Sequence, residues 1–482
     1  MITYASGVGL DVAREELWRP RMGWLMWNTV TLVAGGVLLS AAIATACAWV
    51  VERTDIPMPK LWRALLVAPL AVPAFVNGYA WVSLTHAVEG YAGAVLIVSL
   101  SYFPFVYLPV TASLMRLDPE FEDVARTLGV GPWATFARVV LPQLRPALFG
   151  GCLLVALHLL AEFGALQMLR FPTFTVAIYE QFGTTFNGPA ANLTASVLVL
   201  FCLIVLVGEL RLRGKASLVR VGAGVARPAS RLRLGRLRMP VGLGLAAVAV
   251  LAIGVPMFSL VHWMVVGSST QFPLEDLVQT TLTTLGFAAV GAAVATIVAV
   301  PVAIVVVRHP SWVSTIAERG TFAASALPGI VVALSLVGLV LNAVPALYQT
   351  AAVLVGAYVM MYASRAVVGV RAAMEHAPPR LEEVAGALGL GTWATFRRVT
   401  LPLVAPGITA AAALVFIAIA TELTATLLLA PIGTRTLATQ FWSHSSSLSY
   451  GAAAPYALLI VVLSIPATVM LGRLATPGRS TR

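Results

Sequence analysis

Charged residues and cysteines are scarce in this sequence. Only 11% of the 482 residues are charged, whereas 59% are hydrophobic, and this balance excludes an ordinary soluble globular protein. The three cysteines, Cys47, Cys152 and Cys202, stand singly in apolar runs. We therefore expect them to be packing residues, with neither a disulfide framework nor a cysteine metal site. The composition indicates a protein of the lipid bilayer.

Motifs of catalytic sites are also missing. The sequence contains no H-E-x-x-H metalloprotease motif and no nucleophile elbow. The segment from Gly208 to Ala216 is the nearest approach to a phosphate-binding loop, but its spacing is wrong and it lacks the final Ser or Thr. We therefore expect no catalytic site and no cofactor bound by this chain.

Long apolar runs dominate the sequence instead. Eleven of them have the length that crosses a bilayer, which predicts an all-α polytopic membrane protein. They lie at about 24–51, 62–86, 91–115, 146–168, 192–210, 241–265, 279–307, 321–343, 349–373, 406–429 and 452–472. Pro69, Pro73 and Pro328 fall inside two of these spans, where they mark either unwound segments near a translocation path or mere kinks.

One stretch occurs twice. Glu122 to Pro142 reads EDVARTLGVGPWATFARVVLP, and Glu382 to Pro402 reads EEVAGALGLGTWATFRRVTLP, at a constant offset of 260 residues (382 − 122). More than half of the aligned positions are identical, which indicates an internal duplication. We name residues 116–145 the first repeated loop and residues 375–405 the second repeated loop.

Each repeated loop is predicted to form a helix, a turn and a second helix. In the first loop Asp118 can cap the start and Pro119 suits the first helical position. Gly129 supplies a left-handed stop, and Leu141-Pro142 ends the second helix. Apolar residues recur at helical spacing on one narrow face: Phe121, Val124, Ala125 and Leu128, repeated as Leu381, Val384, Ala385 and Leu388.

A thin apolar stripe between membrane spans favours a docking element for another protein over an ordinary solvated connector, because a mere connector needs no fixed glycine. The opposite face of the second repeated loop carries Glu382, Glu383, Arg397 and Arg398. Trp133 and Trp393 either anchor the docked partner or rest at the membrane interface.

The pattern resembles the coupling-loop signature of permease subunits of ATP-binding-cassette importers. It is carried by Asp123-Val124-Ala125, Gly129 and Val139-x-Leu141-Pro142, and again by Glu383-Val384-Ala385, Gly389 and Val399-x-Leu401-Pro402. Asp123 replaces a family Glu, and Val replaces the middle Ala twice. The resemblance implies a type I importer permease fold of two tandem repeats, whose loops fit a groove on a separate ATPase. It assigns that contact to Asp123, Ala125, Gly129, Leu141, Pro142, Glu383, Ala385, Gly389, Leu401 and Pro402.

The distribution of charge predicts the orientation. Nine Arg or Lys residues and no acid lie between Arg211 and Arg238, so this linker is expected in the cytoplasm. Six predicted spans separate the two repeated loops, an even number, which puts both loops on that side. The net charge of +11 is therefore a topology signal, and we expect no nucleic-acid partner.

These boundaries divide the chain into five parts. The family pattern of six spans in each repeat implies a helix before residue 24, so either this chain lacks that helix or its start lies within a longer reading frame. The parts are an extracytoplasmic segment (1–23), a first repeat (24–210), a basic cytoplasmic linker (211–239), a second repeat (240–475) and a cytoplasmic tail (476–482).

Two carboxylates stand inside predicted spans, where charge is costly and often functional. Glu162 and Glu422 are 260 residues apart, like the loops, and each lies well past the midpoint of its span. His158 is one helical turn before Glu162, on the same face. One hypothesis is that these residues line a cation route and that the two glutamates bind the metal transiently, since a hard trivalent ion favours oxygen ligands. The alternative is a buried structural acceptor or an interhelical latch.

Two further segments, Ala161 to Phe182 and Thr421 to Trp442, resemble the fused permeases of ferric-iron importers. This resemblance implies an extracytoplasmic binding protein and two ATPase subunits that form a homodimer and carry ATP and magnesium. Fused permeases for thiamine and for 2-aminoethylphosphonate share the architecture, so these substrates stay open. An ion-coupled secondary transporter also shows repeats and intramembrane carboxylates, but it needs no duplicated docking loop.

Overall fold

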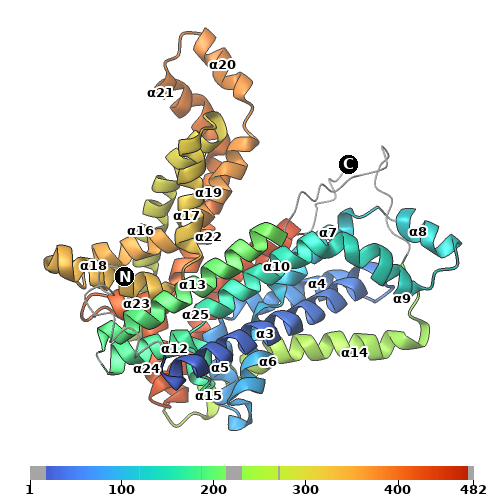
Figure 1. The fold of residues 1–482 in the computed structure, drawn as a ribbon, viewed down its shortest axis with the longest axis horizontal. Coiled ribbons are helices and arrows are strands. Elements are labelled where there is room, and N and C mark those ends of the chain that lie inside the picture. Colours follow the sequence, from blue (N-terminus) through green and yellow to red (C-terminus); the bar gives the residue numbers. More distant parts are fainter. Residues whose placement is uncertain (1–17, 119, 186, 213–230, 270–271, 476–482) are drawn as a thin grey trace. The chain divides into compact units, whose positions relative to one another are not determined.

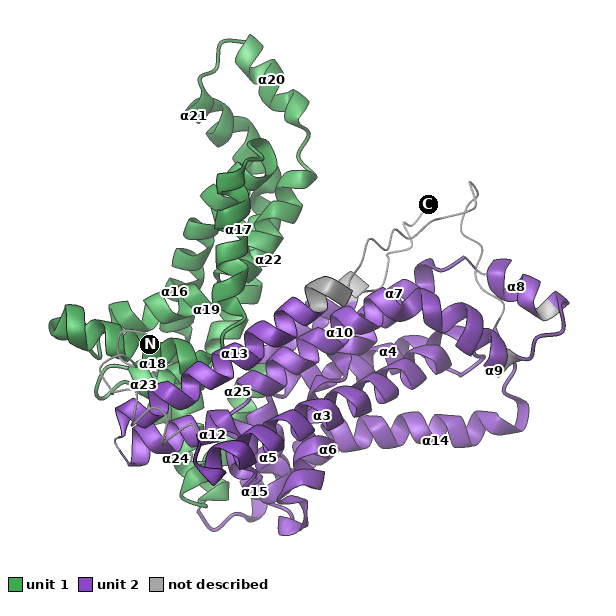
Figure 2. Cartoon of the chain, in the orientation of Figure 1, with its two compact units in different colours: residues 1–7, 271–463 green, residues 8–270, 464–482 purple. Residues whose placement is uncertain are grey.

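The computed structural model describes residues 18–118, 120–185, 187–212, 231–269 and 272–475, and every regular element among them is a helix (Figure 1). A single isolated bridge joins Thr54 to Leu232. The chain divides into two compact units (Figure 2): unit 1 holds residues 1–7 and 271–463, and unit 2 holds residues 8–270 and 464–482. The predicted all-α class is confirmed.

Unit 2 contains the first repeat. Its elements run from α3 to α15, and the η labels mark short 3₁₀ or π turns. They are α3 (Pro20–Arg53), α4 (Pro59–Val67), η1 (Ala68–Ala71), α5 (Ala74–Val82), η2 (His86–Val88), α6 (Tyr91–Tyr102), α7 (Pro104–Arg116), α8 (Glu120–Thr127), α9 (Pro132–Thr135), η3 (Phe136–Val140), α10 (Leu141–Ala161), α11 (Gly164–Met168), α12 (Phe174–Tyr179), η4 (Glu180–Thr184), α13 (Gly188–Leu212), η5 (Gly235–Leu237), α14 (Arg238–Ala249), η6 (Val250–Gly254) and α15 (Val255–Val266).

Unit 1 contains the second repeat, and the boundary between the units falls within its last helix, α25. Its elements are α16 (Leu274–Arg308), α17 (Trp312–Ser325), α18 (Gly329–Ala343), η7 (Pro345–Leu347), α19 (Ala351–Glu375), α20 (Pro379–Ala387), α21 (Thr392–Thr395), η8 (Phe396–Thr400), α22 (Leu401–Ala420), α23 (Thr424–Leu429), α24 (Leu437–Ser446) and α25 (Tyr450–Ala475).

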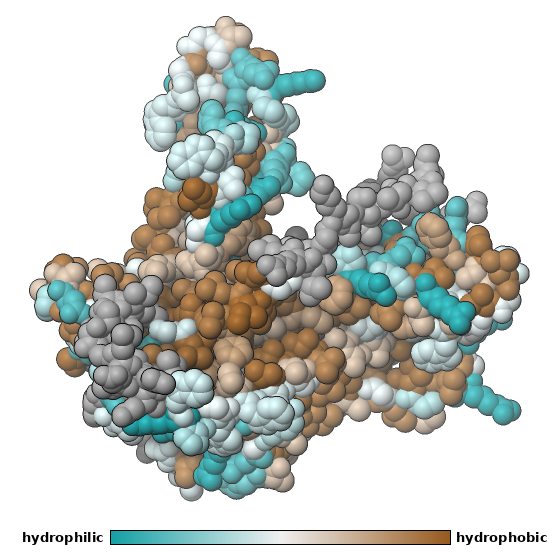
Figure 3. Space-filling model, in the orientation of Figure 1, coloured by the Kyte–Doolittle hydropathy of each residue, from teal (hydrophilic) through white to brown (hydrophobic). Residues whose placement is uncertain are grey.

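The eleven predicted spans all correspond to helices. Among the described residues, eight helices are long and apolar enough to cross a membrane, and the number reaches eleven if each of three bent pairs counts as one span. The long helices expose apolar side chains on their outer faces; Figure 3 shows such brown surface along the helices of unit 1. Lipid is the solvent that such a surface requires.

Two of the bent pairs occupy equivalent places in the repeats, and prolines explain both bends. The break between η1 and α5 turns the chain by 89° at Pro73, and the break between α17 and α18 turns it by 104° at Pro328. Each proline stands at the N-cap of the following helix, where its missing N–H costs no helical bond. Pro69 lies in η1, next to the first break. The predicted proline breaks are therefore confirmed as sharp bends.

Close packing is duplicated as well. A Cβ added at Gly36 in α3 would lie 2.6 Å from Leu159 of α10, and one added at Gly291 in α16 would lie 2.8 Å from Ile419 of α22. A Cβ at either glycine would force the end of the facing side chain to shift, so the first helix of each repeat passes close to the helix that follows the loop at a glycine. The duplication thus extends from the loops into the cores.

The helix predicted at 241–265 belongs to unit 2. It comprises α14, η6 and α15, and it packs against α4, α5 and α6. The sequence analysis assigned this span to the second repeat, and in the structure the span packs on helices of unit 2.

Candidate functional site

The repeated loops form the predicted pair of helices in both units. They are α8 with α9 in the first repeated loop and α20 with α21 in the second, and Figure 1 shows each pair beyond the ends of longer helices of its own unit. Gly129 has φ +78° and Gly389 has φ +83°, so the predicted left-handed stops are confirmed. The N–H of the residue after each glycine then donates back across the turn, Val130 to the Ala125 carbonyl at 3.0 Å and Leu390 to the Ala385 carbonyl at 3.1 Å.

The apolar stripe is exposed to nearly the same extent in both loops. In the first loop the exposed fractions are 41% for Phe121, 56% for Val124, 76% for Leu128 and 78% for Trp133; in the second they are 43% for Leu381, 55% for Val384, 78% for Leu388 and 72% for Trp393. Large apolar side chains exposed at this level within one patch mark an interaction surface.

One member of the predicted stripe was placed wrongly. Ala125 is only 7% exposed and Ala385 only 4%, so both alanines face inward, away from the stripe. The reason is local: α8 packs against α9 and η3, and α20 packs against α21 and η8. A small residue is therefore needed at this position to let the two helices of the loop meet.

The prediction that Leu141-Pro142 ends the second loop helix was also wrong. The chain passes from α9 through the π turn η3 into α10 without a stop, and from α21 through η8 into α22, so the helical segments run from Trp133 to Ala161 and from Thr392 to Ala420. Pro142 and Pro402 lie in the first turn of the long helices, directly after the π turns η3 and η8. Proline has no N–H to donate, and at this position the helix continues without that hydrogen bond. Each loop is thus rigidly joined to a span.

The acidic positions of the loops differ in environment. Asp123 and Glu383 are exposed. Glu382, predicted on the face opposite the stripe, pairs with Arg308 at 2.9 Å, and the equivalent Glu122 pairs with Arg53 at 3.0 Å. The sequence analysis did not predict that either arginine contacts a loop. Asp118 does cap α8, since its Oδ1 accepts the Glu120 N–H at 3.1 Å, and Pro119 lies outside the described residues.

The two carboxylates that the sequence places inside spans stand where the long helices break. In unit 2, α10 ends at Ala161, and Glu162 follows with an extended backbone. Its Oε1 accepts the Ala165 N–H at 2.9 Å, and its Oε2 accepts a hydrogen bond from the Tyr102 hydroxyl. Glu162 therefore caps the short helix α11.

Glu422 plays the same part in unit 1. It follows the end of α22 and is 8% exposed. Its Oε1 accepts the Ala425 N–H at 2.9 Å, while its Oε2 accepts the N–H and the hydroxyl of Thr426 at 3.0 and 2.8 Å. Both oxygens are thus held by the start of α23. This geometry supports the structural-acceptor alternative, and the cation route stays a prediction.

His158 and Glu162 both contact Tyr102. Its ring centroid lies 4.5 Å from that of Phe105 and 5.4 Å from that of Tyr102, and its Nδ1 lies 2.7 Å from the Leu154 carbonyl oxygen. Tyr102 is the residue that joins the two predicted pathway groups. Within the described part of the chain, no group of three or more His, Cys, Asp or Glu is arranged to hold a metal ion.

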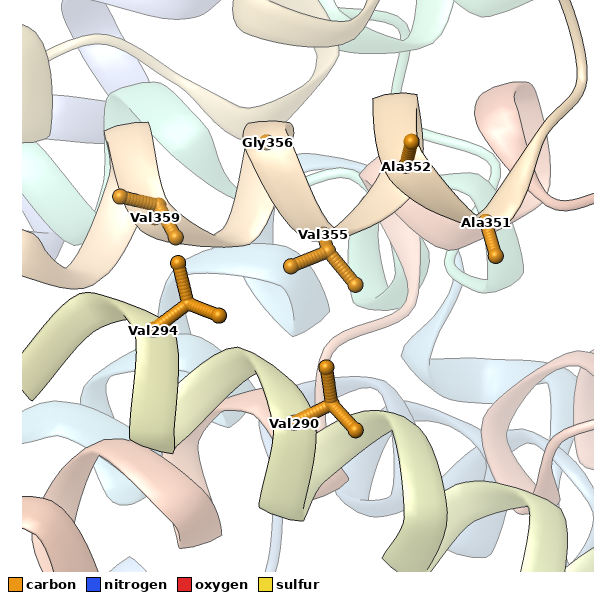
Figure 4. Close-up of a pocket in the computed structure, with 7 residues that line it drawn as sticks. All are labelled: Val290, Val294, Ala351, Ala352, Val355, Gly356 and Val359. Atoms are coloured by element: carbon orange, nitrogen blue, oxygen red, sulfur yellow. The ribbon is translucent and has the colours of Figure 1, made fainter. Parts of the chain in front are cut away.

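An apolar groove lies between α16 and α19, with a volume of about 500 Å³ (Figure 4). It offers carbon atoms alone from its side chains, so it provides no ligand for a hard cation. Its lining residues are Val290, Val294, Ala351, Ala352, Val355, Gly356 and Val359.

Comparison with known proteins matches the repeats to one family. The profile of the family described as "Binding-protein-dependent transport system inner membrane component" matches residues 23–210 and again residues 291–476. The predicted internal duplication is therefore confirmed.

The individual relatives are permease proteins of transport systems. The chain is 38% identical over 468 residues to the Fe(3+)-transport system permease protein FbpB 2 of Haemophilus influenzae, covering 96% of this chain and 92% of that protein. It is 31% identical over 222 residues to the sulfate transport system permease protein CysT of Escherichia coli, covering 39% of this chain and 79% of the relative. It is also 31% identical over 146 residues to the molybdenum transport system permease protein ModB of Escherichia coli, covering 27% of this chain and 63% of the relative.

Proposed function

Since this chain belongs to the binding-protein-dependent transport system inner membrane component family, we propose that it is the two-repeat permease of an importer for ferric iron, driven by a separate ATPase. As a member of that family it is a transport permease of the ATP-binding-cassette type, with several membrane-spanning helices. The substrate, the docking of the ATPase and the orientation in the membrane are the parts that we propose.

The single observation that carries the proposal is the matched pair of apolar stripes. Leu128 and Leu388 are 76% and 78% exposed, and each follows a carboxylate that is also exposed, Asp123 or Glu383. Two equal surfaces on one chain fit two equal partners, which a homodimeric ATPase provides. An apolar centre with a charged rim is the usual composition of a protein interface.

The loops are joined to the membrane helices in a way that suits transmission. Because α9 continues through η3 into α10, and α21 continues through η8 into α22, a shift of either loop moves a whole span. ATP-driven closure of the ATPases would thus turn the spans of each unit and alternate access to the pathway. In this arrangement the loops and the linker face the cytoplasm, and a binding protein delivers the substrate on the other side.

Ferric iron is proposed because the relative with the printed name Fe(3+)-transport permease aligns over 96% of this chain. Thiamine and 2-aminoethylphosphonate are the alternatives that the two-repeat architecture leaves open. Relatives named for sulfate and molybdenum match over 39% and 27% of the chain.

Uptake into proteoliposomes tests the proposal. Vesicles would hold this chain with its ATPase and receive the binding protein loaded with labelled ferric iron, thiamine or aminoethylphosphonate. We expect uptake of ferric iron that depends on ATP inside the vesicle. Uptake of thiamine alone would show that the substrate is thiamine and leave the ATP-driven mechanism standing. Uptake driven by an ion gradient without ATP would contradict the proposal.

A further inference from the structure

We propose that Arg53 and Arg308 are positioning residues that fasten each repeated loop to the first helix of its repeat, so that movement of the loop reaches that helix as well as the one that follows the loop. The proposal rests on the proposed function, because it concerns how a docked ATPase moves the spans. It assigns a role to two residues that lie outside the loops.

The first fastening lies in unit 2. Arg53 is the last residue of α3, and its Nη2 lies 3.0 Å from Oε1 of Glu122 in α8. The same nitrogen donates to the carbonyl of Leu114, near the end of α7, at 3.1 Å. One guanidinium therefore joins three helices: α3, the helix that leads into the loop, and the loop helix itself. The side chains of Arg53 and Glu122 are only 5% and 4% exposed.

The second fastening repeats the design in unit 1. Arg308 is the last residue of α16, and its Nε and Nη2 lie 3.3 and 2.9 Å from Oε1 of Glu382 in α20. Its Nη2 also donates to the carbonyl of Ala377, just beyond the end of α19, at 3.0 Å. The Thr400 hydroxyl in η8 donates to the same carboxylate oxygen at 3.0 Å. This pair is more open, with 15% of Arg308 and 28% of Glu382 exposed.

The same arginine–glutamate pair occurs in both repeats, which argues that the pair has a role in each. The two glutamates differ by the loop offset of 260 residues, and the two arginines end equivalent helices. Arginine suits the task because its planar fork can bind a carboxylate and a carbonyl at once, whereas the lysine ammonium is a compact point charge. It also stands at a helix C-terminus, where a cation is favourable.

The mechanical consequence follows from the contacts of the first helices. α3 packs against α7 and α10, and α16 packs against α19 and α22. A loop joined only to α10 or α22 could tilt that helix and leave the first helix behind. Fastened at the arginine, the loop shifts two packed helices of its unit together. Loss of the fastening should therefore weaken coupling between hydrolysis and transport without removing the docking surface.

The test compares three variants of the full chain reconstituted with its ATPase and binding protein. Arg308→Gln removes the charge and the fork, Arg308→Lys keeps the charge alone, and Arg319→Gln is the matched control at an exposed arginine of α17. Three quantities are measured: the amount of ATPase bound, its rate of ATP hydrolysis, and substrate uptake for each ATP hydrolysed.

We expect Arg308→Gln to bind the ATPase as the wild type does and to lower uptake per ATP about tenfold, within the 5- to 150-fold range of typical coupling between sites. Arg308→Lys should fall between this variant and the wild type, and Arg319→Gln should match the wild type. Unchanged uptake per ATP in Arg308→Gln would overturn the proposal. Failure of the wild-type chain to bind the ATPase would instead overturn the proposed function.

Arg53→Gln extends the test to the enclosed pair. Because that arginine is nearly fully buried, its variant can lose folding along with coupling, so the more open Arg308 carries the decision. A folded Arg53→Gln protein should show the same loss of uptake per ATP.

Discussion

The two repeats present the same loop surface but hold it differently. The exposed fractions of the matched stripe residues agree within a few per cent, as with Val124 at 56% and Val384 at 55%. The arginine pairs behind the loops do not agree: the side chain of Glu122 is 4% exposed and that of Glu382 is 28% exposed. The exposed stripe is alike in the two repeats, whereas the burial of the ion pair behind it differs.

The first repeat has an additional support that the second lacks in the described residues. The Leu232 N–H donates to the carbonyl of Arg53 at 2.8 Å, and the Asp55 N–H donates to the carbonyl of Leu232 at 3.1 Å. The Asp55 side chain accepts the Leu234 N–H at 2.9 Å. The end of the basic linker therefore lies against the residue that fastens the first repeated loop, which helps to explain why this pair is enclosed.

The largest expected difference between the repeats concerns the two glutamates. Glu122→Ala leaves the charge of Arg53 buried, and we expect it to lower the free energy of unfolding by about 3–5 kcal/mol. Glu382→Ala leaves a more exposed arginine and should cost about 1 kcal/mol. Unfolding of both variants by SDS in mixed micelles measures the difference. Equal losses would show that burial does not separate the two pairs.

The two capping carboxylates give the next effect. Glu422→Ala leaves the N–H groups of Ala425 and Thr426 without their acceptor, at a cost of about 1–3 kcal/mol for a buried group. Glu162→Ala releases one backbone N–H, that of Ala165, and the Tyr102 hydroxyl, one donor fewer than Glu422→Ala, so its loss should be smaller. The same unfolding assay ranks them, and a larger loss for Glu162→Ala would contradict the capping geometry.

Glutamine variants separate capping from the predicted cation route. Glu162→Gln with Glu422→Gln keeps one acceptor oxygen at each site, so assembly should persist. If the glutamates only cap helices, uptake of ferric iron stays near the wild-type rate. Loss of uptake in the assembled double variant would restore the cation route.

Backbone strain should affect both loops alike. Gly129→Ala and Gly389→Ala each place an L-residue at positive φ, which costs roughly 1–2 kcal/mol, and no atom lies within 4 Å to add a clash. Gly391→Ala is the control, since Gly391 has φ −66°. Thermal unfolding of the three variants should show two equal losses and one negligible change. A loss confined to one loop would break the equivalence of the two turns.

The smallest effect should be confined to the first repeat. Asp55→Ala removes the acceptor of the Leu234 N–H, which is worth about 0.5–1.5 kcal/mol. The linker end should then be released, and limited proteolysis between Arg231 and Arg238 should speed up. Unchanged cleavage would show that this contact does not hold the linker.

The sequence predicted those features that depend on local pattern. The eleven spans follow from runs of apolar residues, the bends from Pro73 and Pro328, and the turns of the loops from Gly129 and Gly389. Each of these depends on a residue type acting on its own neighbours in the chain, which is why spacing alone reveals it.

Features that depend on distant partners were not predicted. Arg53 ends a helix and resembles any topology signal until Glu122 is seen beside it. Glu162 and Glu422 lie within apolar runs, and only the backbone shows that the long helices stop just before them. A proline normally breaks the hydrogen-bond pattern of a helix, which is why the sequence predicts a helix end at Pro142; in the structure the π turn η3 precedes Pro142 and the helix continues.

The most direct measurement of the central claim is the number of ATPase subunits held by this chain without nucleotide. Leu128→Glu and Leu388→Glu place a charge in the centre of each exposed stripe, and exposed positions make misfolding a minor concern. Purified complexes would be weighed by native mass spectrometry. We predict two ATPase subunits on the wild-type chain, one on either single variant and none on the double variant. Two subunits retained on the double variant would contradict the assignment of the repeated loops as docking sites.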